Sequence, residues 1–260
     1  MNVVVLGSGS RGNAVAITTD QATILIDAGF SPRAMRRRAT AAGVDLSKLV
    51  GVILTHEHGD HARGAVALAS AAGCELYASG GTLSRLGCVG RIIGQLETIA
   101  IGPFWLSACR TRHDAAEPIA LSITGPDGEK LGLAYDLGEA GVAVRYVLRA
   151  AECLIVEANY DDLMLQTGPY PPSVRYRIAG PAGHLSNRAA AELLAELWHP
   201  GLRTVVLAHV SEQCNRPGMA ESHVRGALEP LGFEGELLVA PQDGALGPIA
   251  VARADATSPA

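Results

Sequence analysis

The chain has few aromatic residues, since phenylalanine, tryptophan and tyrosine together make up 4% of its 260 residues. Its core must therefore consist mainly of valine, isoleucine, leucine and alanine. It also lacks any apolar run close to the roughly 20 residues of a membrane-spanning helix, and no basic and apolar leader follows Met1. We therefore expect a protein that makes no membrane contact and is not exported.

Paired cysteines are missing as well. The five cysteines are odd in number and widely spaced, and none belongs to a Cys-x-x-Cys motif. This pattern is typical of a reducing compartment, where disulfides do not persist. The sequence therefore predicts a cytoplasmic protein and leaves its oligomeric state open.

An excess of positive charge is absent too, because the formal net charge is −5. Such a chain has no overall attraction to nucleic acid, so a polyanion must be held by a local basic surface. Arginines gather in two places, and the candidate contacts to phosphates are Arg33, Arg36, Arg37 and Arg38 in one cluster and Arg175 and Arg177 in the other. The alternative is that both clusters are ordinary solvated helix faces.

Apolar segments of strand length alternate with helical segments along the chain. We expect strands over residues 3–6, 14–18, 23–27, 49–54, 75–78, 102–108, 130–135, 153–157, 203–207 and 236–240. We expect helices over residues 33–42, 62–72, 186–197 and 219–228. Strands in both halves with helices between them predict two sheets packed face to face and covered by helices. Because no linker divides the chain, we predict one domain over 1–251 and a disordered tail over 252–260.

Gly7-Ser8-Gly9-Ser10-Arg11-Gly12 matches the G-x-G-x-x-G fingerprint of dinucleotide-binding proteins and follows an expected strand. In those proteins a helix begins directly after the glycines, and its N-terminus holds the pyrophosphate. Here Asn13 leads into Ala-Val-Ala-Ile-Thr-Thr, which predicts a second strand. We therefore interpret the motif as a glycine-rich turn between strands and expect no dinucleotide cofactor.

Four side chains able to bind metals stand within six residues, in Thr55-His56-Glu57-His58-Gly59-Asp60-His61. Neutral imidazole and carboxylate are common ligands of zinc and similar ions. The motif follows an expected buried strand, and Gly59 is expected to let the backbone turn there. His56 and His58, two apart on extended chain, can hold one ion, while Asp60 and His61 beyond the turn can hold a second.

Three further candidate ligands, His113, Asp136 and His209, each come at or soon after the end of an expected strand. Side chains in such positions can converge at one rim of a sheet. One histidine after a strand is usually only hydrogen-bonded. Three such residues together with the dense motif predict a site for two metal ions.

With these ligands the chain resembles the metallo-β-lactamase superfamily, whose hallmark is a His-x-His-x-Asp-His run. The resemblance extends from residue 7 to about residue 244 and implies an αββα sandwich, an α/β fold of two packed mixed sheets flanked by helices, with the site at one edge. It further implies that Asp27 supports the site loop without binding metal. The implied ligands are His56, His58 and His113 for the first metal, Asp60, His61 and His209 for the second, and Asp136 as a bridge between them.

Shorter motifs resemble the YycJ/WalJ-type branch of that superfamily, over residues 7–13, 113–118, 168–171, 183–187 and 208–211. That branch is associated with DNA exonuclease activity, and its relatives include tRNA 3′-processing nucleases and a cyclic-phosphate phosphodiesterase. Two departures leave the substrate preference open. Cys214 stands where the branch more often has asparagine, and Tyr135 stands where threonine commonly precedes the aspartate.

The resemblance implies hydrolysis of a phosphodiester by a hydroxide that two divalent ions activate, zinc or else manganese or iron. The expelled alkoxide needs a proton. His184 is the candidate donor and Glu157 its orienting partner, similar to a glutamate and histidine in the tRNA-processing relatives, and Asp60 is the third expected catalytic residue. The alternative for His184 is that it caps the helix that begins near Ser186.

The leading hypothesis is therefore a metal-dependent phosphodiesterase or nuclease that acts on DNA as an exonuclease. Candidate substrate contacts are Arg36, Arg37, Arg175, Arg177, Ser186 and Asn187. The first alternative is a phosphodiesterase for small cyclic substrates. A thioester or lactam hydrolase is disfavoured, because residues 113–118 lack the Pro-Gly-His pattern of glyoxalase-type thioesterases. A metal-stabilised scaffold without activity is a third alternative, although a scaffold has no need of an open two-metal site.

Overall fold

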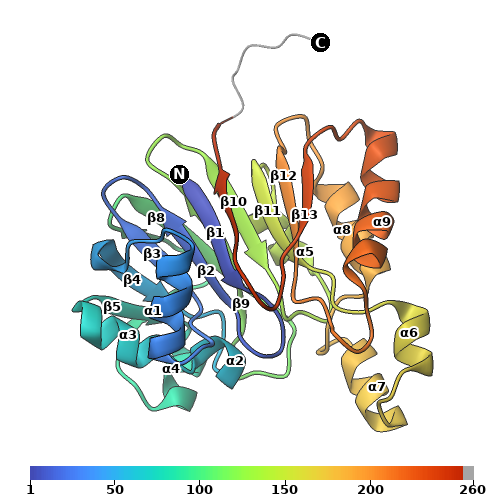
Figure 1. Ribbon diagram of the computed structural model, residues 1–260, viewed down its shortest axis with the longest axis horizontal. Helices are drawn as coiled ribbons and strands as arrows, with labels where there is room; N and C mark the ends of the chain where they lie inside the picture. Colours follow the sequence, from blue (N-terminus) through green and yellow to red (C-terminus); the bar gives the residue numbers. More distant parts are fainter. Residues whose placement is uncertain (254–260) are drawn as a thin grey trace.

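Two seven-stranded sheets form the centre of the molecule (Figure 1). The structure is a computed structural model, and it describes residues 1–253. Sheet A has the order β14-β1-β2-β3-β4-β5-β6 and consists of β1 (Asn2–Gly7), β2 (Ala14–Thr18), β3 (Thr23–Ile26), β4 (Leu49–Ile53), β5 (Glu75–Ala78), β6 (Arg91–Ile92) and β14 (Leu246–Ala250). Sheet B has the order β13-β12-β11-β10-β9-β8-β7 and consists of β7 (Thr98–Ile101), β8 (Phe104–Arg110), β9 (Ile119–Thr124), β10 (Lys130–Ala134), β11 (Cys153–Glu157), β12 (Thr204–Ala208) and β13 (Glu236–Val239).

The two sheets pack face to face on a core of mostly aliphatic side chains. Val3, Val15 and Ile24 of sheet A share one buried cluster with Leu106 and Ile155 of sheet B. Successive residues of a strand point to opposite faces of its sheet. Strands β11 and β12 are nevertheless buried at every position, which means that their outer face is covered as well.

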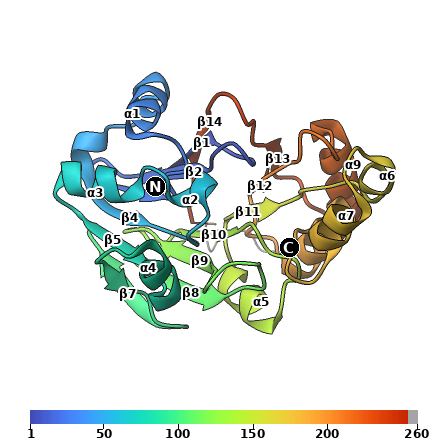
Figure 2. The same ribbon diagram turned by 90° about the horizontal axis from the view of Figure 1, so that it is seen from below.

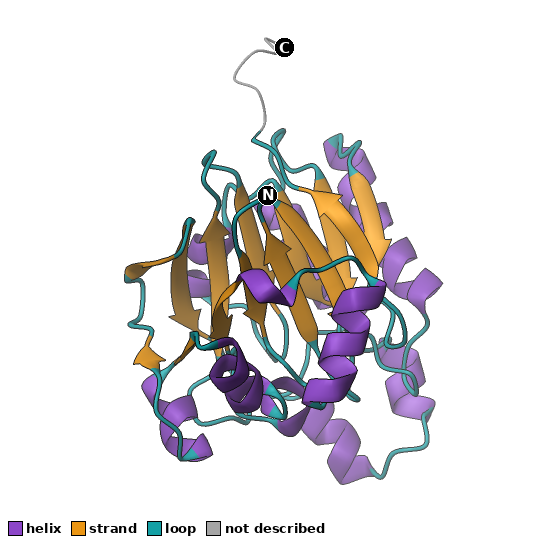
Figure 3. Cartoon of the chain, turned by 60° about the vertical axis from the view of Figure 1, so that its left-hand side comes forward, coloured by secondary structure: helices purple, strands orange, loops and turns teal. Residues whose placement is uncertain are grey.

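Helices provide that cover, and Figure 3 shows them both in front of and behind the strands. Outside sheet A, a second core joins strand residues such as Leu6 to Met35 and Leu68; the helices of this half are α1 (Pro32–Ala41), α2 (Gly59–Ala62), α3 (Ala65–Ala72) and α4 (Gly80–Leu86). Outside sheet B, a third core joins Leu154 to Leu194 and Val224; the helices here are α5 (Val142–Leu148), α8 (Asn187–Leu197) and α9 (Pro217–Leu228). Each half is therefore a sheet with its own helical layer, as expected for an αββα sandwich.

Two short helices, α6 (Asp162–Thr167) and α7 (Pro172–Ala179), project from the molecule at the lower right of Figure 1. Their segment packs on a small separate cluster of Tyr160, Leu165 and Cys214. One-turn 3₁₀ helices at Leu46–Lys48 and Glu229–Leu231 complete the secondary structure of the described residues.

The direction of the strands decides where a site can form. Strands β3 to β6 run parallel to one another, and so do β10 to β13. The C-terminal ends of each set therefore lie at one edge of its sheet. In parallel sheets this edge is where ligands bind, because the connecting loops there can carry functional side chains.

Most of the expected elements are confirmed, and β1 is followed directly by β2 as the interpretation of residues 7–13 required. The helix predicted over residues 62–72 is confirmed as α3, but it begins later, at Ala65, because the chain separates it from α2 at Gly64. Gly64 lies against the segment after β3, where its N–H donates to the carbonyl of Ala28 and an added Cβ would overlap the carbonyl oxygen of Phe30. Helices α4 to α7 were missed because none exceeds eight residues, too short for apolar periodicity to show.

Within residues 1–253, no helix combines the length and the apolar character needed to cross a membrane. Residues 254–260 of the predicted tail lie outside the described part of the chain. That residues 1–251 form one domain stays a prediction.

Candidate metal centre

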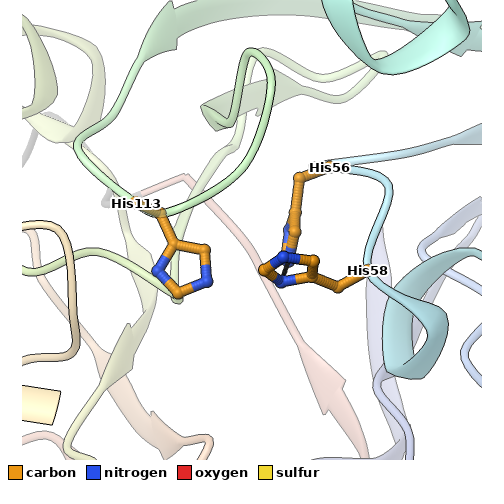
Figure 4. Close-up of side chains that lie close together, drawn as sticks. All are labelled: His56, His58 and His113. Atoms are coloured by element: carbon orange, nitrogen blue, oxygen red, sulfur yellow. Dashed lines mark hydrogen bonds between the residues drawn. The ribbon is translucent and has the colours of Figure 1, made fainter. Parts of the chain in front are cut away.

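The first group of candidate metal ligands comprises His56, His58 and His113 (Figure 4). His56 and His58 come from the loop after β4, and His113 faces them from the loop between β8 and β9 (Figure 4). One nitrogen of each ring lies within 4.8 Å of the others. Nδ1 of His113 lies 3.0 Å from the carbonyl oxygen of Gly183 and donates to it, which leaves Nε2 facing His58.

The second group comprises Asp60, His61 and His209, whose candidate ligand atoms also lie within 4.8 Å of one another. Asp60 and His61 belong to α2, whereas His209 directly follows β12 of the other sheet. Oδ2 of Asp60 lies 3.5 Å from Nε2 of His61 and 3.8 Å from Nε2 of His209. Both groups therefore combine residues from the two halves of the sandwich.

Asp136 lies between the two groups. Its Oδ2 is 2.6 Å from Nε2 of His61 and 3.8 Å from Nε2 of His56, while its Oδ1 is 3.1 Å from Nδ1 of His209. The residue is 2% exposed, so its charge has no solvent to screen it. The family resemblance implied Asp136 as a bridge, and that role stays a prediction for a residue that lies between the two groups.

Three residues of the centre have a left-handed backbone conformation, with φ of 58° at Asp27, 53° at Asp136 and 51° at His209. They come just after β3, β10 and β12, respectively. For residues other than glycine this conformation costs ~1–3 kcal/mol each, and it is typical of functional sites that the surrounding structure holds in place. Gly59, in contrast, begins the helix α2, so the prediction that its conformational freedom makes the turn is wrong.

Asp27 holds the ligand loop from beneath. Its Oδ2 accepts from the hydroxyls of Thr55 at 2.8 Å and Tyr135 at 2.7 Å, and it lies 2.8 Å from Nδ1 of His61. A carboxylate on Nδ1 keeps the proton there and leaves Nε2 of His61 free for a metal. Asp27 therefore orients a candidate ligand, as expected, and Tyr135 supports it although threonine is commoner at that position in the resembling branch.

The glycine-rich loop at residues 7–13 contributes to the centre in a way that the sequence did not reveal. The Ser8 hydroxyl accepts from the backbone N–H of His209 at 2.8 Å, and Nδ2 of Asn13 lies 3.0 Å from Nε2 of His61. Asn159 also contacts His209, because its Nδ2 donates to the carbonyl oxygen at 2.8 Å. No local pattern marks these residues, since their partners are 48 to 201 positions away in the chain.

Burial and neighbouring charges shift the pKa values of the residues in the centre in opposite directions. Burial lowers the pKa of His209, but the charge on Asp136 and contacts with the carboxylates of Asp60 and Glu157 outweigh it and raise the pKa to about 9. Burial likewise raises the pKa of Asp136, but His209 and His61 bring it well below the usual value. Imidazolium protons thus balance the buried carboxylate, and a divalent cation would replace them, which is why metal binding releases protons.

Two atoms of the centre test whether the site fits a metal. Both atoms are buried. Nε2 of His209 makes no hydrogen bond to any residue in the range 1–253, and Oδ1 of Asp136 has the ring nitrogens of His184 and His209 beside it, each at 3.1 Å. Buried polar atoms are nearly always paired, so the unpaired ring nitrogen needs a partner. An oxygen and a nitrogen beside further imidazoles and a carboxylate are the ligand types that zinc, manganese and iron take.

Glu157 and His184 form a pair beside the two groups. Nδ1 of His184 lies 2.7 Å from Oε1 of Glu157, and Oε2 of Glu157 accepts from the backbone N–H groups of Leu137 and Leu185, each at 3.1 Å. Glu157 is fully buried, whereas the His184 side chain is 19% exposed. The alternative that His184 caps α8 is wrong, because Ser186 is the cap and accepts from the N–H of Ala189.

The candidate substrate contacts differ in whether their side chains are exposed or already bonded to other residues. Arg36 and Arg37 are exposed on α1. Arg38 stacks on Phe30 and donates to the carbonyl of Leu6 at 2.8 Å, so its role is structural. Arg177 pairs with Asp114 at 2.5 Å, and Arg175 donates to the carbonyl of Gln166. Ser186 and Asn187 are both buried. Ser186 caps α8, and Asn187 is hydrogen-bonded to Asn215. A contact with substrate stays a prediction for each.

Comparison with known proteins now adds to this geometry. The family model of the metallo-beta-lactamase superfamily matches residues 7–155, which include the His-x-His-x-Asp-His run. The chain belongs to the metallo-β-lactamase superfamily. It is 31% identical to exodeoxyribonuclease YycJ of Bacillus anthracis, over 88% of this chain and 89% of that one. It is 27% identical to exodeoxyribonuclease WalJ of Streptococcus pneumoniae, over 81% and 82% of the two chains.

Solved structures of this superfamily confirm the fold. The metallo-β-lactamase fold protein YhfI of Bacillus subtilis superposes with a TM-score of 0.72 at 18% identity, over 95% of this chain and 99% of that one. Human tRNase Z, short form, superposes with a TM-score of 0.66 at 18% identity, over 96% and 100%. The predicted family and αββα fold are thus confirmed. Together with the histidine and aspartate groups, they make this chain a metal-dependent hydrolase.

Proposed function

We propose that this chain is a phosphodiesterase of the nuclease type that holds two divalent ions and degrades DNA from an end. The observation that carries the proposal is the His184–Glu157 pair at 2.7 Å, placed directly beside two complete ligand groups. A phosphodiester needs both charge neutralisation at phosphorus and a proton for the departing alkoxide. The relatives named exodeoxyribonuclease, similar over more than four fifths of the chain, support DNA as the polymer.

The distances support the ligand roles that we propose. His56, His58 and His113 would hold one ion, Asp60, His61 and His209 the other, and Asp136 would contact both. When bound, two such ions lower the pKa of a water that they share and neutralise charge on the phosphoryl oxygens. Asp27 and the carbonyl of Gly183 fix the rings of His61 and His113, so that each presents Nε2 to the centre.

His184 is the proposed proton donor. Burial lowers its pKa, but the charges on Glu157 and Asp136 outweigh that effect and raise the pKa well above the usual value. These carboxylates therefore favour the protonated ring. Because Nδ1 is bound to Glu157, Nε2 is the nitrogen that can give its proton to the leaving oxygen. Glu157 itself cannot turn away, since two backbone N–H groups hold its second oxygen.

The substrate is tested by comparing cleavage of DNA, RNA and a small cyclic phosphodiester by one metal-loaded preparation over a range of salt concentrations. Each contact to a phosphate contributes about −0.9 on double-stranded or −0.7 on single-stranded nucleic acid to the slope of log affinity against log salt. We expect DNA cleavage at subsaturating substrate to weaken steeply with salt and cleavage of the cyclic diester to change little. Replacement of both Arg36 and Arg37 with alanine should flatten the slope for DNA.

The control for that variant is the replacement of Arg203 and Arg225, two exposed arginines in the sheet B half, by alanine. It should leave the slope unchanged, and both variants should hydrolyse bis-p-nitrophenyl phosphate at the original rate. Cleavage of the cyclic diester without any cleavage of DNA would replace the nuclease proposal with that of a small-molecule phosphodiesterase.

A further inference from the structure

A cavity of about 350 Å³ lies directly beside the metal centre. One wall is the loop at residues 110–118, which carries the candidate ligand His113. The other wall is Pro181 and Ala182, which Gly183 connects to His184. The cavity is thus bordered by the two segments that place a metal ligand and the proposed proton donor, whose rings are 5.2 Å apart.

Half of the ten lining residues are apolar and carry no side-chain hydrogen-bonding group. They are Ala115, Ala116 and Pro118 on one side and Pro181 and Ala182 on the other. Small and cyclic side chains of this kind leave flat walls, between which a ring can lie. The volume falls at the lower end of the ~300–1,000 Å³ typical of small-ligand sites. The cavity therefore suits one ring system with its sugar and not an extended polymer.

The arginines at the rim of the cavity are each paired with a glutamate. Arg110 pairs with Glu117, and Arg112 lies 2.8 Å from Glu139. Since each guanidinium faces a carboxylate, the rim has little net charge to attract a phosphate. The ligand that fits is consequently neutral. Thr111 also lines the cavity, and its buried Oγ1 lacks a hydrogen-bond partner among residues 1–253, so rotation of this side chain toward the cavity would offer the hydroxyl to a ligand.

We propose that this cavity binds one of the two nucleosides that flank the scissile phosphate, a subsite that rests on the proposed nuclease function. The base lies between the proline and alanine walls, and the Thr111 hydroxyl pairs with a polar atom of the base or the sugar. The phosphate itself stays at the metal centre. Binding of one flanking nucleoside in this open subsite places the next phosphodiester beside His113 and His184.

The test fills the cavity and measures what the nucleoside contributes. Ala182 is exposed, so Ala182→Leu can fold normally while its larger side chain occupies the space. The substrates are thymidine 3′- and 5′-(p-nitrophenyl phosphate), which carry the phosphate on the 3′ or the 5′ oxygen of the nucleoside. Methyl p-nitrophenyl phosphate, which has no nucleoside, is the third substrate. We expect Ala182→Leu to lower kcat/KM about tenfold for one thymidine isomer, within the range that one bound base contributes, and to leave the methyl ester unchanged.

Ala72→Leu, at an exposed alanine at the end of α3, is the matched control and should affect none of the three substrates. Thr111→Val should weaken the same thymidine isomer, while the free protein becomes no less stable because a buried unpaired hydroxyl is removed. Equal effects of Ala182→Leu on the methyl and thymidine esters, or no effect on either isomer, would overturn the subsite.

Failure of the underlying function has a different signature, since the original chain would then hydrolyse none of the three esters. In that case the subsite is tested by adding thymidine to the protein and monitoring its binding through chemical-shift changes in NMR spectra. Weakening of thymidine binding by Ala182→Leu but not by Ala72→Leu supports the subsite, and undetectable or unaltered binding overturns it.

Discussion

Replacement of His58 by alanine is expected to remove bound metal and to abolish hydrolysis together. His58 is one of three imidazoles whose nitrogens meet within 4.8 Å, and the other two cannot move to fill its place because His56 is buried in the loop after β4 and His113 is fixed by Gly183. Loss of a residue that only hydrogen-bonds to a ligand costs about 10–100-fold in metal affinity or activity. Loss of a ligand should cost more than that.

The matched control is His223→Ala. His223 is exposed on α9, and within residues 1–253 its ring bonds only to the carbonyl of Met219 in its own helix, so its removal should change neither metal content nor rate. Metal per chain and hydrolysis of bis-p-nitrophenyl phosphate are measured on the same preparations. A His58→Ala protein with the original metal content and rate would remove His58 from the centre.

His184→Ala is expected to keep its metals and to lose about 10²–10⁴-fold in rate on DNA, the usual contribution of a positioned general acid. The loss should be much smaller on diesters of p-nitrophenol, because that leaving group departs without a proton. Glu157→Gln should show the same dependence on leaving group to a lesser degree, since it weakens the hydrogen bond that orients His184 without removing the donor.

The two substrates separate proton donation from a structural role. An equal loss on both, with metals retained, would show that His184 only supports the fold of the site. Loss of metal from His184→Ala would make His184 a ligand, and the assignment of His209 would then need revision, since both rings lie 3.1 Å from Oδ1 of Asp136.

The candidate ligands could be identified from the sequence because their signal is local. Four of the seven candidate ligands stand in one short run, and Asp136 and His209 directly follow apolar strands whose ends must meet at one edge of a parallel sheet. The pairing of His184 with Glu157 came from the resemblance to a known family, and the structure places the two side chains in hydrogen-bonding contact.

The residues around the ligands could not be predicted, for two physical reasons. Ser8 and Asn13 act on histidines far away in the chain, so only the packing of β1 and β2 within sheet A brings them into contact. The left-handed conformations of Asp27, Asp136 and His209 are imposed by the surrounding structure, since residues other than glycine adopt them uncommonly and no local pattern marks where they do. The break at Gly64 has the same origin, because a carbonyl from another segment occupies the space of a side chain.

The central claim is that two divalent ions and these seven side chains form one hydrolytic site. It is tested most directly by stripping the chain with a chelator, adding manganese or zinc in steps, and following bound metal and hydrolysis of bis-p-nitrophenyl phosphate together. We predict no hydrolysis by the stripped chain and a rate that rises until two ions are bound per chain. Full activity of the metal-free chain, or a rate already maximal at one bound ion, would contradict it.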